Sequence, residues 1–335
     1  MHGLLKITIA LLLIVPNLAF SFDKPGTTAA TFLQIIPSSR LASMGGAGVA
    51  FSGGPEMLAI NPAAVKPSDN LAASFSYLDW FAGLNHQTLA VTAPVTPDLR
   101  LGFHTIYFGG DDFEQTTLDQ PDGNGIMVDY GDIALGGSAI MTLTDRFTVG
   151  VTGKYIRQNL FNTHAQTIAF DIGTMLVTSL DGFSIGMAMT NLGGDMQLGG
   201  RDLIMETSSD DEAETRLHTS SWPLPLTFQT GIAWRLLGND QAFWANDSHG
   251  LTIVADGKHL NEGVTTVHFG AEYNLRQLVF LRGGRTLDHD TEGWAFGAGI
   301  RLKLSSMLVE ADFAYADLGA LSSVKRVTIG LSGAE

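Results

Sequence analysis

The chain has 335 residues, of which 45% are apolar, 39 are glycine and none is cysteine, so neither disulfides nor a thiolate metal site can form. Its formal net charge of −15 argues against nucleic acid as a partner and against charge-driven docking on anionic lipid. After residue 21, no stretch reaches the roughly 18 consecutive apolar residues of a membrane helix. This composition fits lipid-facing strands, and it also fits a soluble all-β protein.

Residues 1–21 have the pattern of a secretory signal peptide. Lys6 supplies the positive start, residues 7–15 form an apolar core, and small residues at Ala19 and Ser21 predict cleavage before Phe22. The apolar core is shorter than a membrane span, so we prefer a signal peptide to an N-terminal anchor helix.

Residues 22–70 lack strand periodicity and are predicted to form a short plug inside a barrel. Gly45 and Gly46 permit tight turns and close approach to another surface. Pro55 can begin a short helix over residues 55–60, and Asn61 ends it because Pro62 follows.

Residues 71–335 contain about fourteen segments in which apolar residues alternate with small or polar ones, the period of a strand. In residues 147–155, for example, Val149 and Val151 share one face and Lys154 falls on the other. The segments predict an all-β fold: a transmembrane antiparallel β-barrel of about 14 strands, with hydrocarbon on one face and a polar lumen on the other. A large soluble sandwich with one wet face is the alternative.

The connections between these segments alternate in length. Tight turns near residues 95–97, 142–145 and 179–182 are predicted to be periplasmic, and the long connections 109–131 and 192–223 to face outward. The long connection 237–248 breaks this rule. The long outer loops are acidic, which we interpret as solvation, with divalent-ion bridging as the alternative.

Charged residues on the polar faces of the strands are candidates for the lumen: Lys154, Arg235, Glu272, Arg282, Glu310 and Asp312. Their mixed signs favour internal ion pairs over a ring of one charge for ion selectivity. Aromatic residues near strand ends, including Trp80, are candidates for interfacial girdles.

No motif predicts an enzyme, a cofactor or a metal site. Residues 182–186 match G-x-S-x-G, but strand alternation continues through Ser184, whereas a nucleophile elbow needs a strand, a turn and a helix. A barrel hydrolase assembled from distant residues is the weakest of the readings.

The sequence resembles the PorV/PorQ-like outer-membrane proteins of the FadL-like superfamily. The resemblance rests on residues 27–35 and 39–47, on the Asn61-Pro62-Ala63 motif, and on residues 191–193, 224–228, 281–284 and 314–315. It implies a 14-stranded barrel in the bacterial outer membrane, residues 71–335, closed by a plug over residues 22–70. For the site it implies plug motif residues Gly45, Gly46, Asn61, Pro62 and Ala63.

The resemblance implies type IX-like protein secretion or surface assembly, in which loops 109–132 and 192–223 bind a translocon or secreted cargo. The alternative is a FadL-like channel that passes hydrophobic small molecules through the lumen and a lateral opening. Apolar residues lining a pocket beside the plug would favour the channel. An occluded lumen with exposed apolar loops would favour the partner role. Both hypotheses make outer-membrane lipid a partner.

Overall fold

The computed structural model describes residues 26–205, 215–239, 241–289 and 291–333. The predicted signal peptide, residues 1–21, lies outside this range. Among the described residues, no helix is both long enough and apolar enough to cross a bilayer.

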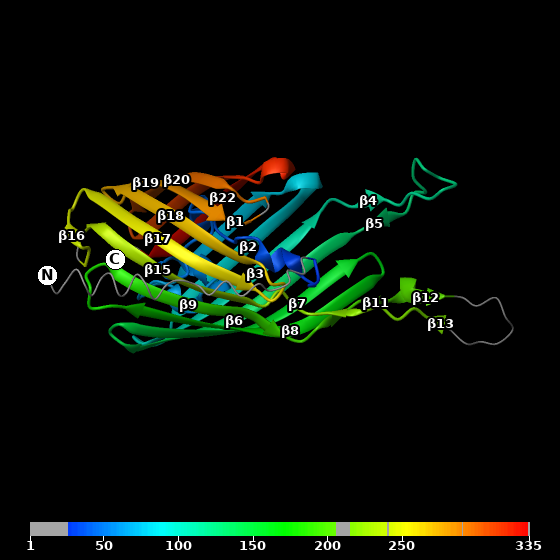
Figure 1. The fold of residues 1–335 in the computed structure, drawn as a ribbon, viewed down its shortest axis with the longest axis horizontal. Helices are drawn as coiled ribbons and strands as arrows, with labels where there is room; N and C mark the ends of the chain where they lie inside the picture. The colour runs from blue at the N-terminus through cyan, green and yellow to red at the C-terminus, as the bar shows by residue number, and fades with distance from the viewer. Residues whose placement is uncertain (1–25, 206–214, 240, 290, 334–335) are drawn as a thin grey trace.

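The described chain is dominated by a closed antiparallel barrel of 14 strands (Figure 1). In chain order and in space the strands are β1 (Ala72–Asp79), β2 (Leu84–Pro94), β3 (Leu99–Gly110), β6 (Tyr130–Thr144), β7 (Phe147–Leu160), β8 (Thr163–Val177), β9 (Phe183–Gly193), β15 (Thr227–Gly238), β17 (His249–Leu260), β18 (Thr265–Leu275), β19 (Val279–Leu287), β20 (Trp294–Leu304), β21 (Met307–Asp317) and β22 (Ser323–Gly333). The last strand pairs with the first, from Ala72↔Ser332 to Asp79↔Lys325, so the sheet has no free edge there.

Alternation along each strand decides which side chains face out. On β7, Val151 is 45% exposed while the adjacent Thr152 is fully buried. Exposed apolar side chains recur on the outward face of strand after strand, as on β1 (Phe75), β3 (Phe103), β18 (Phe269) and β20 (Phe296). Such a face is stable against hydrocarbon and would be costly in water, so the predicted membrane barrel is confirmed over a soluble sandwich.

The two ends of the barrel differ as the connection lengths predict. One end carries short turns such as residues 145–146 and 305–306, and we call it the inner end. At the outer end, residues 111–129 and the described residues 194–205 and 215–222 of the next long connection project beyond the barrel as arms, at the right of Figure 1. The arms contain the short ladders β4 (Phe113–Glu114) with β5 (Met127–Val128), β10 (Met196–Gln197) with β14 (Ser221–Trp222), and β12 (Ile204–Met205) with β13 (Thr215–Arg216). Beside them, β11 (Gly199–Gly200) pairs with β8 and leads into η5 (Arg201–Leu203).

The long inner connection after β15 has a structural explanation. Within it, β16 (Trp244–Ala245) folds back parallel to β15. Phe243 stacks edge-on between Trp234 and Trp244, with ring centroids 5.5 and 4.8 Å away. This aromatic stack at the inner rim is typical of a membrane–water interface.

Residues 26–70, which we call the plug segment, run through the lumen from the outer end to the inner end. The backbone N–H of Ala29 donates to Pro223 O in an outer connection at 2.9 Å, and that of Ala30 donates to Gln158 near the outer end of β7. At the other end, Asn70 lies against Gly333 at the inner rim. The segment contains η1 (Thr31–Gln34), α2 (Ser39–Ser43), η2 (Pro55–Ala59) and η3 (Pro62–Ala64).

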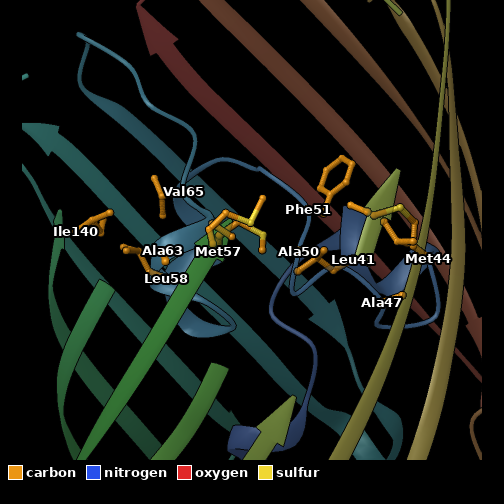
Figure 2. Packing of buried hydrophobic residues seen from close by; sticks show 14 of the residues in the cluster. Leu41, Met44, Ala47, Ala50, Phe51, Met57, Leu58, Ala63, Val65 and Ile140 are labelled. Carbon is orange, nitrogen blue, oxygen red and sulfur yellow. The ribbon is translucent and has the colours of Figure 1, made fainter. Parts of the chain in front are cut away.

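The plug segment supplies most of the apolar core inside the barrel. Figure 2 shows Leu41, Met44 and Phe51 on one side of the lumen and Met57, Leu58 and Val65 on the other. Most of these side chains are less than 5% exposed. Because this buried cluster reaches from one side of the lumen to the other, side chains of the plug segment pack the middle of the barrel.

Candidate functional site

The Asn61-Pro62-Ala63 motif joins the plug segment to the barrel wall. The buried Asn61 amide donates to Val49 O at 2.7 Å and to Thr174 O of β8 at 3.1 Å, while its Oδ1 accepts from Ala63 N at 3.0 Å. A Cβ on Gly173 of β8 would lie 2.0 Å from Asn61 Oδ1, so only glycine fits there. The motif residues predicted from sequence therefore lie together at one contact.

Gly45 and Gly46 form a second contact with the wall. Both have left-handed φ, +67° and +80°, which L-residues rarely adopt. Gly45 O accepts from His268 Nδ1 at 2.6 Å and from Thr286 Oγ1 at 3.1 Å. A Cβ on Gly284 of β19 would meet Met44 at 2.0 Å, so the two backbones touch directly.

A buried ion network ties helix α2 to the wall. Arg40 and Arg282 both bind Glu272, with N–O distances of 2.7 and 2.6 Å, and Arg282 also binds Asp312 at 2.6 Å. Burial lowers the pKa of Arg40, but the charge of Glu272 and its hydrogen bonds outweigh burial, so the net shift is upward. Three of the six lumen candidates, Glu272, Arg282 and Asp312, thus meet in one network.

The other three candidates lie apart from this network. Lys154 pairs with Asp171 at 2.8 Å and also donates to Asn191, all buried. Glu310 pairs with Arg301 at 2.6 Å, with both side chains about a quarter exposed. Arg235 is on the inward register of β15 beside buried Ala233, but it is exposed near the inner end and forms no ion pair among the described residues.

A cavity of about 230 Å³, which we call the outer cavity, opens beside the plug segment at the outer end. Ile35 and Ile36 of the plug segment line one side, and Leu78 and Val324 of the wall line the other. Further lining comes from Trp80, Phe81, Trp294, Ala295, Ala314, Leu318, Leu321 and Arg326. Mostly apolar walls with a few polar groups are typical of small-molecule sites.

The position of Trp80 differs from its predicted place in a girdle. Residues 81–83 form the turn η4 (Phe81–Gly83), with Ala82 at φ 60°, and η6 (Gly319–Leu321) lies in the connection after β21. Trp80 packs with the apolar clusters under these outer connections and lines the outer cavity instead of facing lipid.

A second, smaller cavity of about 50 Å³, the seam cavity, lies on the other side of the plug residues 33–36. Its wall includes Thr190 of β9 and Thr227 of β15. These two residues form the last pair of the β9–β15 ladder, and no pairing between the two strands continues beyond them. The seam cavity therefore lies directly behind the place where two wall strands part.

The parting of the two strands has a local cause. Asn191 has a left-handed φ of 64°, and the β8–β9 register shifts between Phe170 and Ile172. The backbone N–H of Asn191 donates to Asp171 Oδ1 at 2.8 Å. Its side-chain amide donates to Pro225 O at 3.0 Å. The chain bends at this bulge, and buried Leu224 packs against Gly193 just beyond it.

Several buried charged residues were not among the sequence candidates. Asp256 of β17 accepts from the backbone N–H groups of Gly48 and Val49 at 2.6 and 2.8 Å, a cap for the plug segment. Arg40 lies in the plug segment, where no periodicity marks a face. Asp171, Asp256 and Arg326 lie on the polar faces of strands, and that signal could have found them. Within the described chain, no group of three or more His, Asp or Glu is placed to hold a metal ion.

No protein-family model matches the chain, and no curated protein matches it. Several solved structures do match the chain in their fold. The toluene transporter TbuX of Ralstonia pickettii aligns with a TM-score of 0.55 and 14% identity, over 88% of this chain and 97% of that one. The monoaromatic hydrocarbon channel CymD aligns with a TM-score of 0.56 and 12% identity, over 93% and 98%. The toluene transporter TodX of Pseudomonas putida gives 0.54 and 12%, over 88% and 97%.

The chain shares the barrel fold of these three proteins. The barrel, its apolar outward face and these likenesses locate the protein in the bacterial outer membrane. At such low identity the likeness concerns the fold, and what the three channels carry is a property of those proteins. The finer resemblance to PorV/PorQ-like proteins stays a prediction.

Proposed function

We propose that the protein is an outer-membrane channel for small hydrophobic molecules. The observation that carries the proposal is the outer cavity, which has apolar walls and lies against the plug segment at the end of the barrel that faces outward. Its volume of about 230 Å³ falls just below the roughly 300–1,000 Å³ of sites for drug-sized ligands, so a small ligand fits it best.

The filled middle of the lumen favours an exit through the wall. The ion network and the apolar cluster block the direct path toward the inner end. The seam cavity, separated from the outer cavity by Ile35 and Ile36, lies where β9 and β15 part. In the proposed route, a ligand enters the outer cavity, passes the plug residues 33–36 and leaves between these strands.

An uptake assay with matched variants tests the proposal. Ala295 and Ala298 lie on the same strand, β20, but Ala295 is buried and lines the outer cavity while Ala298 faces outward and is exposed. Cells that express the protein should take up radiolabelled toluene, 1-octanol or octanoate faster than cells that lack it. Ala295→Trp should abolish the gain, and Ala298→Trp should preserve it. If no probe enters faster with the protein, the channel proposal is wrong.

A second candidate is the partner role in secretion or surface assembly. It is supported by apolar side chains exposed on the outer arms, including Phe113, Leu118 and Met127 on the β4–β5 arm and Leu217 and Trp222 on the other. Gentle detergent extraction followed by affinity purification tests this role. Stoichiometric recovery of a translocon or cargo protein, lost when residues 115–126 are deleted, would favour it over the channel.

A further inference from the structure

Cations on the outward face of the barrel gather at its outer end. Among the described residues of the wall strands, three Lys or Arg face outward: Arg157 on β7, Arg285 on β19 and Lys325 on β22. Each lies within four residues of the outer end of its strand, and none of the described Lys or Arg faces outward on the inner half of a wall strand. The outward cations therefore lie where the apolar band of the wall ends.

Arg157 differs from the other two cations in its surroundings. Arg285 stacks on Trp294, with its guanidinium carbon 5.0 Å from the ring centroid, and Lys325 lies directly opposite Asp79 in the β1–β22 ladder. On β6, β7 and β8, whose residues are all described, no Asp or Glu faces outward. The charge of Arg157 is therefore not offset on its own face of the wall, although the chain as a whole is acidic.

The polar side chains around Arg157 keep hydrogen-bond donors free. Arg157 Nε donates to Asn159 Oδ1 at 2.9 Å, and the Tyr155 hydroxyl donates to Gln166 Oε1 at 2.8 Å, so both amide oxygens already accept a hydrogen bond. Gln166 lies directly opposite Arg157 in the β7–β8 ladder, and His164 lies two residues away on the same face. Within the described chain, Arg157 Nη1 and Nη2, Gln166 Nε2 and the His164 ring have no hydrogen-bond partner.

These donors lie just beyond the apolar band of the wall. Ile168 of β8, two residues from Gln166 on the same face, is 60% exposed. Gly199 of β11 pairs with His164, and a Cβ on Gly199 would meet nothing within 4 Å, so the space beside His164 is open. A lipid whose chains lie against the wall at Ile168 would therefore present its headgroup to the free donors.

A phosphate fits this group of donors, because an Arg fork donates two parallel N–H bonds to phosphate oxygens and neutral donors can bind the remaining oxygen. We propose that Arg157, Gln166 and His164 form a binding site for a phosphorylated lipid of the outer leaflet, such as the lipid A part of lipopolysaccharide. The apolar band directly beside the donors favours a lipid over free phosphate. The site lies on the outside of the barrel, so the proposal is independent of the proposed channel function.

Native mass spectrometry of the detergent-solubilised protein, titrated with lipid A or with lipid A whose phosphates have been removed, tests the site. The two probes share their acyl chains and differ in phosphate. The wild type should bind lipid A about 10- to 100-fold more tightly, the range for a hydrogen bond to a charged group. Arg157→Met should remove that preference and leave binding of the dephosphorylated probe unchanged, which would show that the wall is intact in this variant.

Arg285→Met is the matched control, because Arg285 also faces outward at the outer end and its loss changes the charge equally. It should leave the preference for lipid A unchanged. If the wild type binds both probes equally, or if both variants weaken lipid A binding by the same factor, the cations act only as diffuse charge and the proposed site is wrong. An excess of inorganic phosphate should not displace lipid A. If it does, the site takes the free ion and the lipid proposal is wrong.

Discussion

Arg40 of the plug segment forms a bidentate pair with Glu272 of β18: Nε donates to Oε2 and Nη2 donates to Oε1, each at 2.7 Å. Arg282 Nε donates to the same Oε2 at 2.6 Å. Two cations, one on the plug segment and one on the wall, therefore share one carboxylate. Removing either cation leaves the carboxylate only partly compensated, which makes this contact the electrostatic attachment of the plug.

We expect Arg40→Met to loosen the plug segment. Glu272 keeps Arg282, so the loss should fall below the roughly 3–5 kcal/mol of a fully broken buried pair, at about 1–3 kcal/mol. The free energy of unfolding in urea, followed by tryptophan fluorescence, measures the loss. The conductance of the Arg40→Met variant in planar bilayers should be higher than that of the wild type, because α2 would no longer be fixed against β18.

Arg301→Met is the matched control for that experiment. Arg301 also pairs with a carboxylate, Glu310, at 2.6 Å, but both side chains are about a quarter exposed and neither belongs to the plug segment. Partly exposed pairs contribute about 0–1 kcal/mol. An equal loss of stability and an equal rise in conductance in both variants would contradict the assigned role of Arg40.

Asn61→Ala should be among the most destabilising single changes in the plug segment. The substitution leaves two buried carbonyls, Val49 O and Thr174 O, and the Ala63 N–H without their partner. Each unsatisfied group costs about 1–3 kcal/mol, reduced where the site relaxes, so we expect a total loss of about 2–4 kcal/mol. Urea unfolding provides the measurement. Asn85→Ala, which removes a hydrogen bond to Gln87 outside the core, should change stability by less than about 0.5 kcal/mol.

The sequence predicts the barrel well because strand period two is a local signal. Lys154 and Glu272 were assigned to the lumen face by alternation, and both are buried there. Their partners could not be predicted in the same way, since alternation gives the face of a residue and not its neighbour across the lumen. Glu272 and Asp312 are 40 positions apart, and both bind Arg282.

The plug segment was harder to predict, because its residues follow no period. Arg40 lies in a five-residue helix, and nothing local distinguishes it from a solvated arginine. Arg326 is a different case, because it lies on a strand, and alternation places it on the face opposite exposed Lys325, a signal that could have found it. The two cavities depend on side chains from distant strands and could not be predicted from sequence.

Glu56 should make the stability of the plug segment depend on pH. Burial raises the pKa of its carboxyl above the ordinary value of 4.5, and the backbone N–H groups of Glu56 and Gly54 and the charge of Arg40 oppose this only in part. A raised folded-state pKa means that folding favours the protonated form. The stabilisation is therefore fully present below the ordinary pKa and is lost as the pH rises through the folded-state value.

Glu56→Gln isolates this effect, because glutamine keeps the shape of the neutral acid and does not titrate. The unfolding midpoints of the variant and the wild type should agree at low pH, and the variant should become the more stable as the pH rises. Urea titrations at a series of pH values measure the difference. A difference that is constant with pH would show that Glu56 does not titrate in this range.

The proposed wall exit predicts that a cross-link at the β9–β15 seam blocks transport. Thr190 and Thr227 are directly paired, and paired antiparallel residues have Cα separations of about 4.5–5.5 Å, within disulfide range. The chain has no cysteine of its own, so Thr190→Cys with Thr227→Cys creates a single disulfide. Oxidation should abolish most of the uptake, because the last rungs can no longer separate, and a reductant should restore it.

A disulfide elsewhere in the wall separates this effect from general stiffening. Ala139 and Val151 are paired on β6 and β7, both outward-facing and exposed, in a ladder that continues well beyond them toward both ends. Ala139→Cys with Val151→Cys should leave uptake unchanged in both redox states. If the seam cross-link also leaves uptake unchanged, the ligand must instead pass along the plug segment toward the inner end, and loss of the Arg40–Glu272 contact should then speed its passage.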